Sequence, residues 1–249
     1  MSGHSKWATI KHQKGAKDKA RGKLFAKLIR QVEVAAREGG GDLTSNATLR
    51  AMYDKAREAS VPLDTIERAI KRGTGELEGV TYEEMTYEVY GAGGVAILVQ
   101  VLTDNRTRTV AELRSLVQKN AGSLGATGSV AWMFQKRGLV TVERAGVDED
   151  RVMEVALEAG AEDVRESGDI LEVLSAPEKF EAVRTALQQA TVPIASAEIT
   201  LMPQSTVPIS GKPAEQTVRL LEALEDHDDV QSVSSNMDIA PEELERLSA

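Results

Sequence analysis

The sequence predicts an α+β fold in which an N-terminal helical bundle precedes two α+β domains, one inserted in the other. Three observations support this prediction: apolar residues recur with a helical period as far as residue 73, strand-like patterns begin at Met85, and strands and helices alternate regularly after Gly138. The chain of 249 residues is 41% hydrophobic and 28% charged. Such a mix can form the required cores and excludes wholesale disorder.

The first block, residues 1–78, predicts a basic helical domain. Leu24, Leu28 and Val32 recur at steps of four, which is typical of the buried stripe of an amphipathic helix. Glycine, proline and cap residues mark the ends of three expected helices, at about residues 17–38, 46–60 and 63–73. The preceding residues 1–15 are expected to form a flexible basic arm.

The second block predicts a discontinuous α+β domain made of residues 79–136 and 203–249. Residues 96–102 are almost continuously apolar, which indicates a central strand. Residues 79–136 lack one helix and one strand of a complete α+β unit. A helix and a strand near the C-terminus provide these two elements. The expected elements are strands at about residues 85–90, 95–102, 129–135 and 230–235, and helices at 107–120 and 213–226.

The third block, residues 137–202, predicts the inserted domain. Its elements follow in the order βαββαβ, which is typical of a ferredoxin-like unit. The strands are expected at about residues 139–143, 161–166, 170–175 and 196–202, and the helices at 149–159 and 178–190. We expect both α+β domains to be of this ferredoxin-like kind.

The net charge of −9 conceals a strong asymmetry along the chain. Residues 1–30 hold nine Lys or Arg residues and one acid, Asp18, a charge of +8. Residues 31–75 are balanced, so the remaining residues carry −17. A basic end on an acidic body indicates a negatively charged partner that contacts only the basic end. Nucleic acid is the leading candidate, an anionic membrane surface is the second, and a lysine-rich helix kept for solubility is the alternative without a partner.

Lysines and arginines of the basic end are the expected phosphate contacts, because phosphate contacts dominate nucleic-acid affinity. Four of them are spaced four, four and three residues apart and share one helix face. Two arginines that open the helix at 107–120 are additional candidates, although a simple turn with an N-cap explains that segment equally well. The nucleic-acid-binding candidates are Lys6, Lys11, Lys14, Lys19, Lys23, Lys27, Arg30, Arg106 and Arg108. Such contacts position a protein without reading base sequence.

The sequence contains no clear pattern of catalytic or metal-binding residues. The absence of cysteine excludes disulfides, zinc fingers and a cysteine nucleophile, and the three histidines are scattered. The turn at 226–229 (DHDD) contains hard-metal ligand types but is better explained as a solvated turn. No catalytic residue, metal ligand or cofactor is therefore expected, and we predict that the protein is not an enzyme. We also expect no membrane span and no signal peptide, since no apolar run is long enough for either.

Three further patterns bear on nucleic-acid binding. The glycine-rich loop at 122–128 does not lead from a strand into a helix, as a dinucleotide fingerprint requires, although its backbone amides could receive an anion. The glycine-rich stretch at 91–94 is better explained as a hairpin turn. Aromatic residues make up only 4% of the chain, so base stacking on the sheet face of the inserted domain is not expected.

Several segments resemble the YebC/PmpR family in order along most of the chain. They are residues 3–7 (GHSKW), 10–12 (IKH), 35–41 (AAREGGG), 66–73 (IERAIKRG), 103–109 (TDNRTRT) and 128–132 (GSVAW). The resemblance implies three domains and a cytoplasmic, DNA-binding transcriptional regulator. It also implies an alternative, because a mitochondrial relative looks like a translational activator and bacterial relatives are linked to ribosome function. Ala92 and Val89 depart from frequent family residues, but both belong to the hairpin and not to the basic end.

The sequence thus predicts a non-enzymatic nucleic-acid-binding regulator whose basic N-terminal domain makes the contact. The alternatives are a ribosome- or RNA-associated translation factor and an acidic α+β scaffold that binds a protein or metabolite. The basic end argues against the scaffold. It does not separate DNA from RNA, because both present phosphates.

Overall fold

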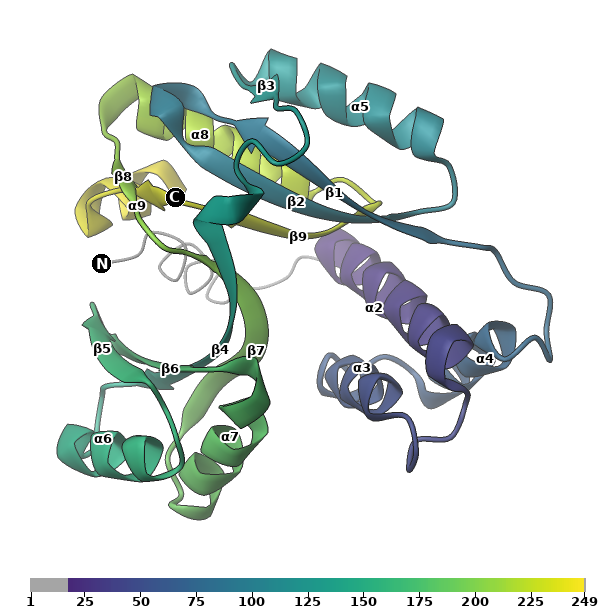
Figure 1. The fold of residues 1–249 in the computed structure, drawn as a ribbon, viewed down its shortest axis with the longest axis horizontal. Coiled ribbons are helices and arrows are strands. Elements are labelled where there is room, and N and C mark those ends of the chain that lie inside the picture. The colour runs from purple at the N-terminus through teal and green to yellow at the C-terminus, as the bar shows by residue number, and fades with distance from the viewer. Residues whose placement is uncertain (1–17, 249) are drawn as a thin grey trace.

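The computed structural model of the chain describes residues 18–248, and the predicted arm at 1–15 lies outside this range. The first part is the predicted bundle of three helices (Figure 1), α2 (Asp18–Gly39), α3 (Ala47–Glu58) and α4 (Leu63–Gly73). The side chain of Asn46 caps α3 by accepting a hydrogen bond from the Leu49 N–H. Gly73 allows α4 to approach α2 closely, because a Cβ at this position would lie 2.4 Å from the Glu33 carbonyl oxygen.

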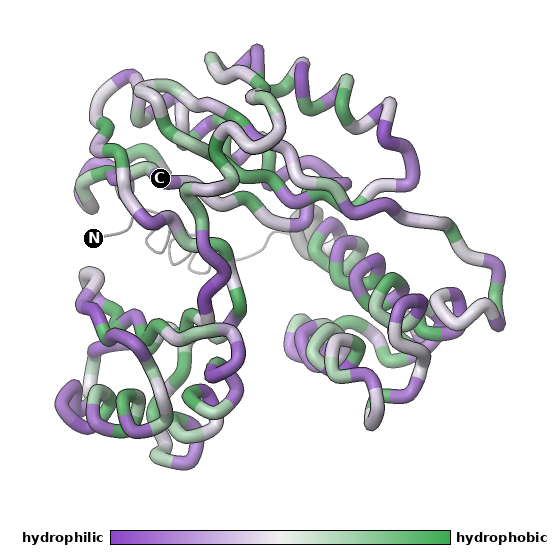
Figure 2. The backbone as a smooth tube through the Cα atoms, viewed as in Figure 1, coloured by the Kyte–Doolittle hydropathy of each residue, from purple (hydrophilic) through white to green (hydrophobic). Residues whose placement is uncertain are grey.

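The bundle buries most of the predicted apolar stripe of α2. Leu28 and Val32 are almost fully buried, together with Leu49 and Ile66 from the other two helices. Figure 2 shows hydrophobic and hydrophilic segments alternating around the turns of α2. Leu24 differs from the prediction, because 44% of its surface is exposed.

A second core lies between a four-stranded antiparallel sheet and two helices. Its elements come from two stretches of chain: β1 (Glu83–Tyr90), β2 (Ala96–Thr103), α5 (Arg106–Lys119) and β3 (Ser123–Leu124), followed much later by α8 (Gly211–Glu225) and β9 (Val230–Ser235). The strand order is β3-β1-β2-β9, so the β1–β2 hairpin occupies the centre of the sheet. Strand β2 is the predicted central strand and is buried at all positions except Gln100. Helices α5 and α8 contribute to one hydrophobic cluster with these strands.

The third core belongs to a βαββαβ unit. Its elements are β4 (Phe134–Glu143), α6 (Glu149–Glu158), β5 (Asp163–Ser167), β6 (Ile170–Ser175), α7 (Phe180–Gln189) and β7 (Ile194–Pro203). The antiparallel strand order β5-β6-β4-β7 is that of the predicted ferredoxin-like unit. Strands β4 and β7 pair from Phe134 opposite Pro203 to Val142 opposite Ile194, and form the ribbon that joins this unit to the second core (Figure 1).

One predicted strand is wrong. Residues 129–133 form a loop that ends in a short 3-10 turn, η2 (Ala131–Met133), and β4 then continues without a break through residues 136–138. The Glu88 side chain binds backbone N–H groups of this loop, which removes them from strand pairing. The proposed domain boundary at 136/137 consequently falls inside β4, and the division at 1–78, 137–202 and the two outer segments stays a prediction.

The remaining elements are short. They are η1 (Ala92–Gly94), η3 (Pro177–Lys179), a parallel pair formed by β8 (Val207–Pro208) and β10 (Met237–Asp238), and the C-terminal α9 (Pro241–Ser248). The turn at 91–94 joins the β1–β2 hairpin, as predicted. Over residues 18–248, we find no helix that combines the length and apolar character needed to cross a membrane.

Candidate nucleic-acid interface

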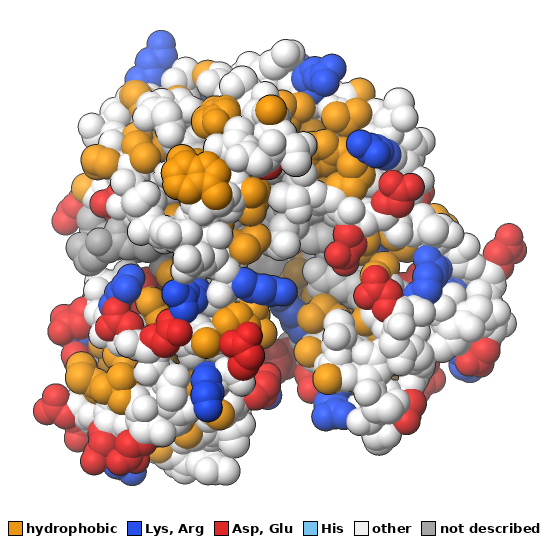
Figure 3. All heavy atoms as spheres, viewed as in Figure 1, with side chains coloured by type: hydrophobic (Ala, Val, Ile, Leu, Met, Phe, Trp, Pro, Cys, Tyr) orange, Lys and Arg blue, Asp and Glu red, His pale blue; other side chains and the backbone are white. Residues whose placement is uncertain are grey.

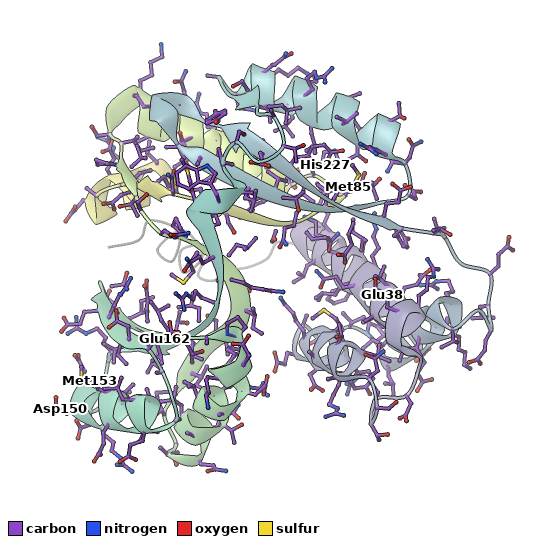
Figure 4. All side chains as sticks on the ribbon, in the orientation of Figure 1. Glu38, Met85, Asp150, Met153, Glu162 and His227 are labelled. Atoms are coloured by element: carbon purple, nitrogen blue, oxygen red, sulfur yellow. The ribbon has the colours of Figure 1, made fainter. Side chains whose placement is uncertain are left out.

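The basic face of α2 is docked onto the C-terminal end of α8. Lys23, Lys27 and Arg30 follow one another at steps of four and three, so they project from one side of the helix, as predicted. They are half-buried instead of fully exposed, because α8 ends directly against them. Figure 4 shows this end of α8, marked by the labelled His227, close to the first turns of α2.

Each of these cations binds a backbone carbonyl at the α8 terminus. The Lys23 Nζ donates to the Asp226 carbonyl oxygen at 2.9 Å, and the Lys27 Nζ donates to that of Glu225 at 2.6 Å. Arg30 donates to the Asp228 carbonyl oxygen at 2.9 Å. The last carbonyls of a helix lack hydrogen-bond partners within it and carry partial negative charge. Cations at this end donate hydrogen bonds to these carbonyls and interact favourably with the helix dipole. This docking joins two segments that lie about 200 residues apart in sequence.

Asp229, which is 3% exposed, is the anionic centre of the contact. Its Oδ2 accepts hydrogen bonds from Thr109 at 2.7 Å and Arg108 at 2.8 Å, and its Oδ1 accepts one from Arg30 at 3.1 Å. Burial raises the pKa of the Asp229 carboxyl, but the hydrogen bonds from Thr109 and Arg108 and the charges of Arg108 and Arg30 outweigh burial and hold this pKa below its ordinary value. Asp229 is therefore ionised and links α2, α5 and the α8–β9 turn.

The two arginines at the start of α5 have different surroundings. Arg108 forms ion pairs with Asp104 at 2.9 Å and with Asp229, so its charge is used in contacts within the protein. Arg106 is exposed, and no contact of its side chain with the described residues is identified as a hydrogen bond or ion pair. Asn105 is the N-cap of α5 and accepts a hydrogen bond from the Arg108 N–H. The alternative explanation of this segment, a turn followed by an N-cap, thus accounts for Arg108. Of the two arginines, Arg106 is the one able to bind an external anion.

An open cleft of about 980 Å³ lies between α2, α5 and the α8–β9 turn. Its charged lining mixes both signs, with the cations Lys23, Arg30, Arg108 and Lys119 and the acids Asp104, Glu112, Asp226, Asp228 and Asp229. Because the five acids outnumber the four cations, the cleft offers no net positive field for a polyanion. It marks the seam between the bundle and the second core.

The turn at 226–229 contains metal-ligand residue types, and Glu112, His227 and Asp229 place ligand atoms within 4.8 Å of one another. The His227 Nδ1 accepts the Asp229 N–H at 3.1 Å, and its Nε2 lies 3.0 Å from Glu112, to which it donates. Asp229 already lies between two guanidinium groups. These contacts occupy the ligand atoms and place positive charge where a cation would bind, so the donor set does not fit a divalent metal.

The glycine-rich loop at 122–128 and the residues after it do receive an anion, but that anion comes from the chain itself. The Glu88 carboxylate accepts hydrogen bonds from the backbone N–H groups of Gly128, Val130 and Ala131. Burial raises the pKa of Glu88, and these backbone donors outweigh it and lower the pKa overall. Backbone amides of this region thus bind an anion, as predicted. The anion is the Glu88 carboxylate of the chain itself and not a phosphate.

The remaining candidates lie at or beyond the edge of the structure. Lys6, Lys11 and Lys14 lie outside the described residues, and Lys19 lies in α2 with a side chain outside them. The sequence did not reveal the partners of Lys23, Lys27 and Arg30. A usable signal was present, however: three acids at 226–229 oppose the dipole of the helix they follow, which indicates that cations must approach this end.

Comparison with known proteins completes this picture. The model of the TACO1/YebC protein N-terminal domain matches residues 5–76, and that of the TACO1/YebC second and third domain matches residues 82–237. The chain belongs to the TACO1/YebC family. It is 54% identical to a "probable transcriptional regulatory protein" of Desulforapulum autotrophicum, over 97% of this chain and 98% of the relative. It is also 54% identical to a protein of the same description from Geobacter sulfurreducens, over 99% and 100% of the two chains.

A solved structure supports the same TACO1/YebC assignment. The crystal structure of a conserved hypothetical protein from Aquifex aeolicus superposes with a TM-score of 0.80 at 44% identity, covering 88% of this chain and 91% of that one. A regulatory role is supported separately, by the names of the curated relatives.

Proposed function

We propose that the protein is a non-enzymatic nucleic-acid-binding regulator that acts in the cytoplasm as a DNA-binding regulator of transcription. The observation that carries this proposal is the charge of +8 on residues 1–30 against −17 beyond residue 75. An acidic body that repels phosphates confines the contact to the basic end. The names of the relatives support a transcriptional role in particular.

The contacts of the basic end suggest two groups of cations. Lys23, Lys27 and Arg30 bind the α8 terminus and Asp229, so in this arrangement they orient the basic end on the body. We therefore assign the primary phosphate contacts to Lys6, Lys11, Lys14 and Lys19, with Arg106 as an additional contact at the start of α5. Phosphate binding by Lys23, Lys27, Arg30 and Arg108 stays a prediction that requires release of their internal partners.

RNA or the ribosome is the second candidate, and the docking of α2 favours it. Proteins that read DNA sequence commonly place a helix in the major groove, where its side chains reach the base edges. The face of α2 that carries Lys23, Lys27 and Arg30 is turned toward α8, so it is not presented to a groove. Phosphate contacts from an arm suit a folded RNA as well as a duplex.

Crosslinking in living cells, followed by sequencing of both bound DNA and bound RNA, separates these functions. A transcriptional regulator gives enriched DNA segments that disappear when Lys6, Lys11 and Lys14 are replaced by Ala. Enrichment of ribosomal or messenger RNA alone would favour the translation factor. Recovery of neither nucleic acid above the level of the triple variant contradicts the proposal.

A further inference from the structure

Two exposed aromatic side chains converge on one carbonyl beside the loop that Glu88 holds. Trp132 is 68% exposed and Tyr90 is 38% exposed. The Trp132 Nε1 donates to the Ser129 carbonyl oxygen at 3.2 Å, and the Tyr90 hydroxyl donates to the same oxygen at 3.4 Å. The only polar atom of the indole is therefore occupied, and its solvent-facing surface is the aromatic ring.

The support of this aromatic pair is built into the fold. Glu88 is 6% exposed and fixes the backbone of residues 128–131 with hydrogen bonds to three N–H groups. The Gln204 side chain adds a hydrogen bond of 3.0 Å to the Trp132 carbonyl oxygen. Tyr90 belongs to β1, whose neighbour Val89 is in the core. A large apolar side chain held rigidly in water binds a partner with little loss of conformational entropy.

The chain segment that carries Trp132 has the opposite charge to the acidic body. Residues 113–142 contain Arg114, Lys119, Lys136 and Arg137 and no acid, although the chain beyond residue 75 carries −17. Arg137 is paired with Glu162, whereas for the other three no ion pair with the described residues is identified. Figure 3 shows few acidic side chains on the visible face of the upper part of the molecule and many over the inserted domain.

We propose that Tyr90 and Trp132 form a stacking platform for unpaired nucleobases of a single-stranded RNA or DNA. This inference rests on the proposed function and deepens it by naming a second contact and the class of strand. Bases stack on exposed aromatic rings whatever their identity, and nearby cations meet the backbone. Lys136, which follows Trp132 by four residues in this acid-free segment, is the candidate cation for that role. A duplex keeps its bases stacked on one another, so it does not supply this contact.

The test uses the full chain with Trp7→Phe, which leaves Trp132 as its one tryptophan. The probes are a labelled single-stranded RNA of 12 nucleotides, the DNA of the same sequence, and the matching duplexes. Single strands are expected to quench the emission of Trp132, and duplexes are not. Trp132→Ala is expected to raise the Kd for single strands roughly 5- to 150-fold, whereas Trp132→Tyr retains most of the affinity. Leu157→Ala, at another exposed apolar residue, is the control and leaves the Kd unchanged.

The salt dependence distinguishes this inference from the proposed function. Stacking releases no counterions, so Trp132→Ala should keep the slope of log Kd against log salt concentration. If Trp132→Ala keeps both the Kd and the salt slope of the parent, the platform is refuted and the regulator proposal stands. The exposed aromatic surface would then be assigned to binding a protein partner. Equal quenching by duplexes also refutes the platform. If the parent binds no nucleic acid at all, both proposals are wrong.

Discussion

Replacing Lys23 and Lys27 together by Ala is expected to destabilise the protein more than it weakens phosphate binding. Each lysine donates to a carbonyl of the α8 terminus, and hydrogen bonds to charged groups contribute about 1.5–3 kcal/mol each. The Lys23 side chain is 27% exposed and its ion-pair partner Asp226 is 73% exposed, so the ion pair adds little. We therefore expect the double variant to lose about 2.5–5.5 kcal/mol, because Ala, although the better helix former, recovers only a few tenths.

For a chain of this size, that loss lowers the Tm by about 5–20 °C. The assay is thermal unfolding followed by circular dichroism, with the salt dependence of oligonucleotide binding measured on the same samples. Arg57→Ala with Arg68→Ala is the matched control, since both arginines are exposed and removing them takes the same charge from the same bundle. A double Lys variant whose Tm stays within about 1 °C of the control, while its salt slope falls by about 2, would refute the docking argument.

Three further outcomes are expected. The pKa values of Asp229 and Glu88 lie below their ordinary values, so both carboxylates stabilise the fold at neutral pH, and urea unfolding should show this stability being lost as the pH falls below about 4. Asp229→Asn should lose less stability over this pH range, and an equal loss in the variant contradicts the assignment. Leu28→Ala should cost about 2–5 kcal/mol because the side chain is 3% exposed, whereas Leu24→Ala, at a site 44% exposed, should cost much less, and equal costs would show that the stripe is wrongly placed. Purified protein should show no hydrolase, nuclease or nucleotide-transfer activity; turnover that survives repurification and is abolished by one carboxylate substitution would reveal a missed site.

Local patterns predicted most of the fold. The helical period of the bundle, the apolar run of β2 and the βαββαβ order of residues 137–202 each follow from neighbouring residues alone. The error at 129–135 has a long-range cause, because Glu88, about 40 residues earlier, binds the backbone that would otherwise pair as a strand. Helix α9 and the β8–β10 pair are too short to carry a clear period.

The candidate site was harder to predict, because its contacts join distant segments. The spacing of Lys23, Lys27 and Arg30 showed that they share a face, but not that the face meets a helix end about 200 residues away. A cation on a helix surface has the same local pattern whether it binds phosphate or a carbonyl. Trp132 lies in one of the segments that resemble the family, but the sequence does not show that its side chain is exposed, because exposure is a property of the folded chain.

The most direct test of the account is the salt dependence of nucleic-acid binding by the full chain and by its variant with Lys6, Lys11 and Lys14 replaced by Ala. With about four to six phosphate contacts, log of the binding constant should fall against log salt concentration with a slope of roughly −3 to −5 between 50 and 200 mM. The triple variant should reduce the magnitude of that slope by about 2–3. A binding constant that does not change with salt, or a triple variant with the slope of the parent, would contradict the claim that the basic end meets phosphate.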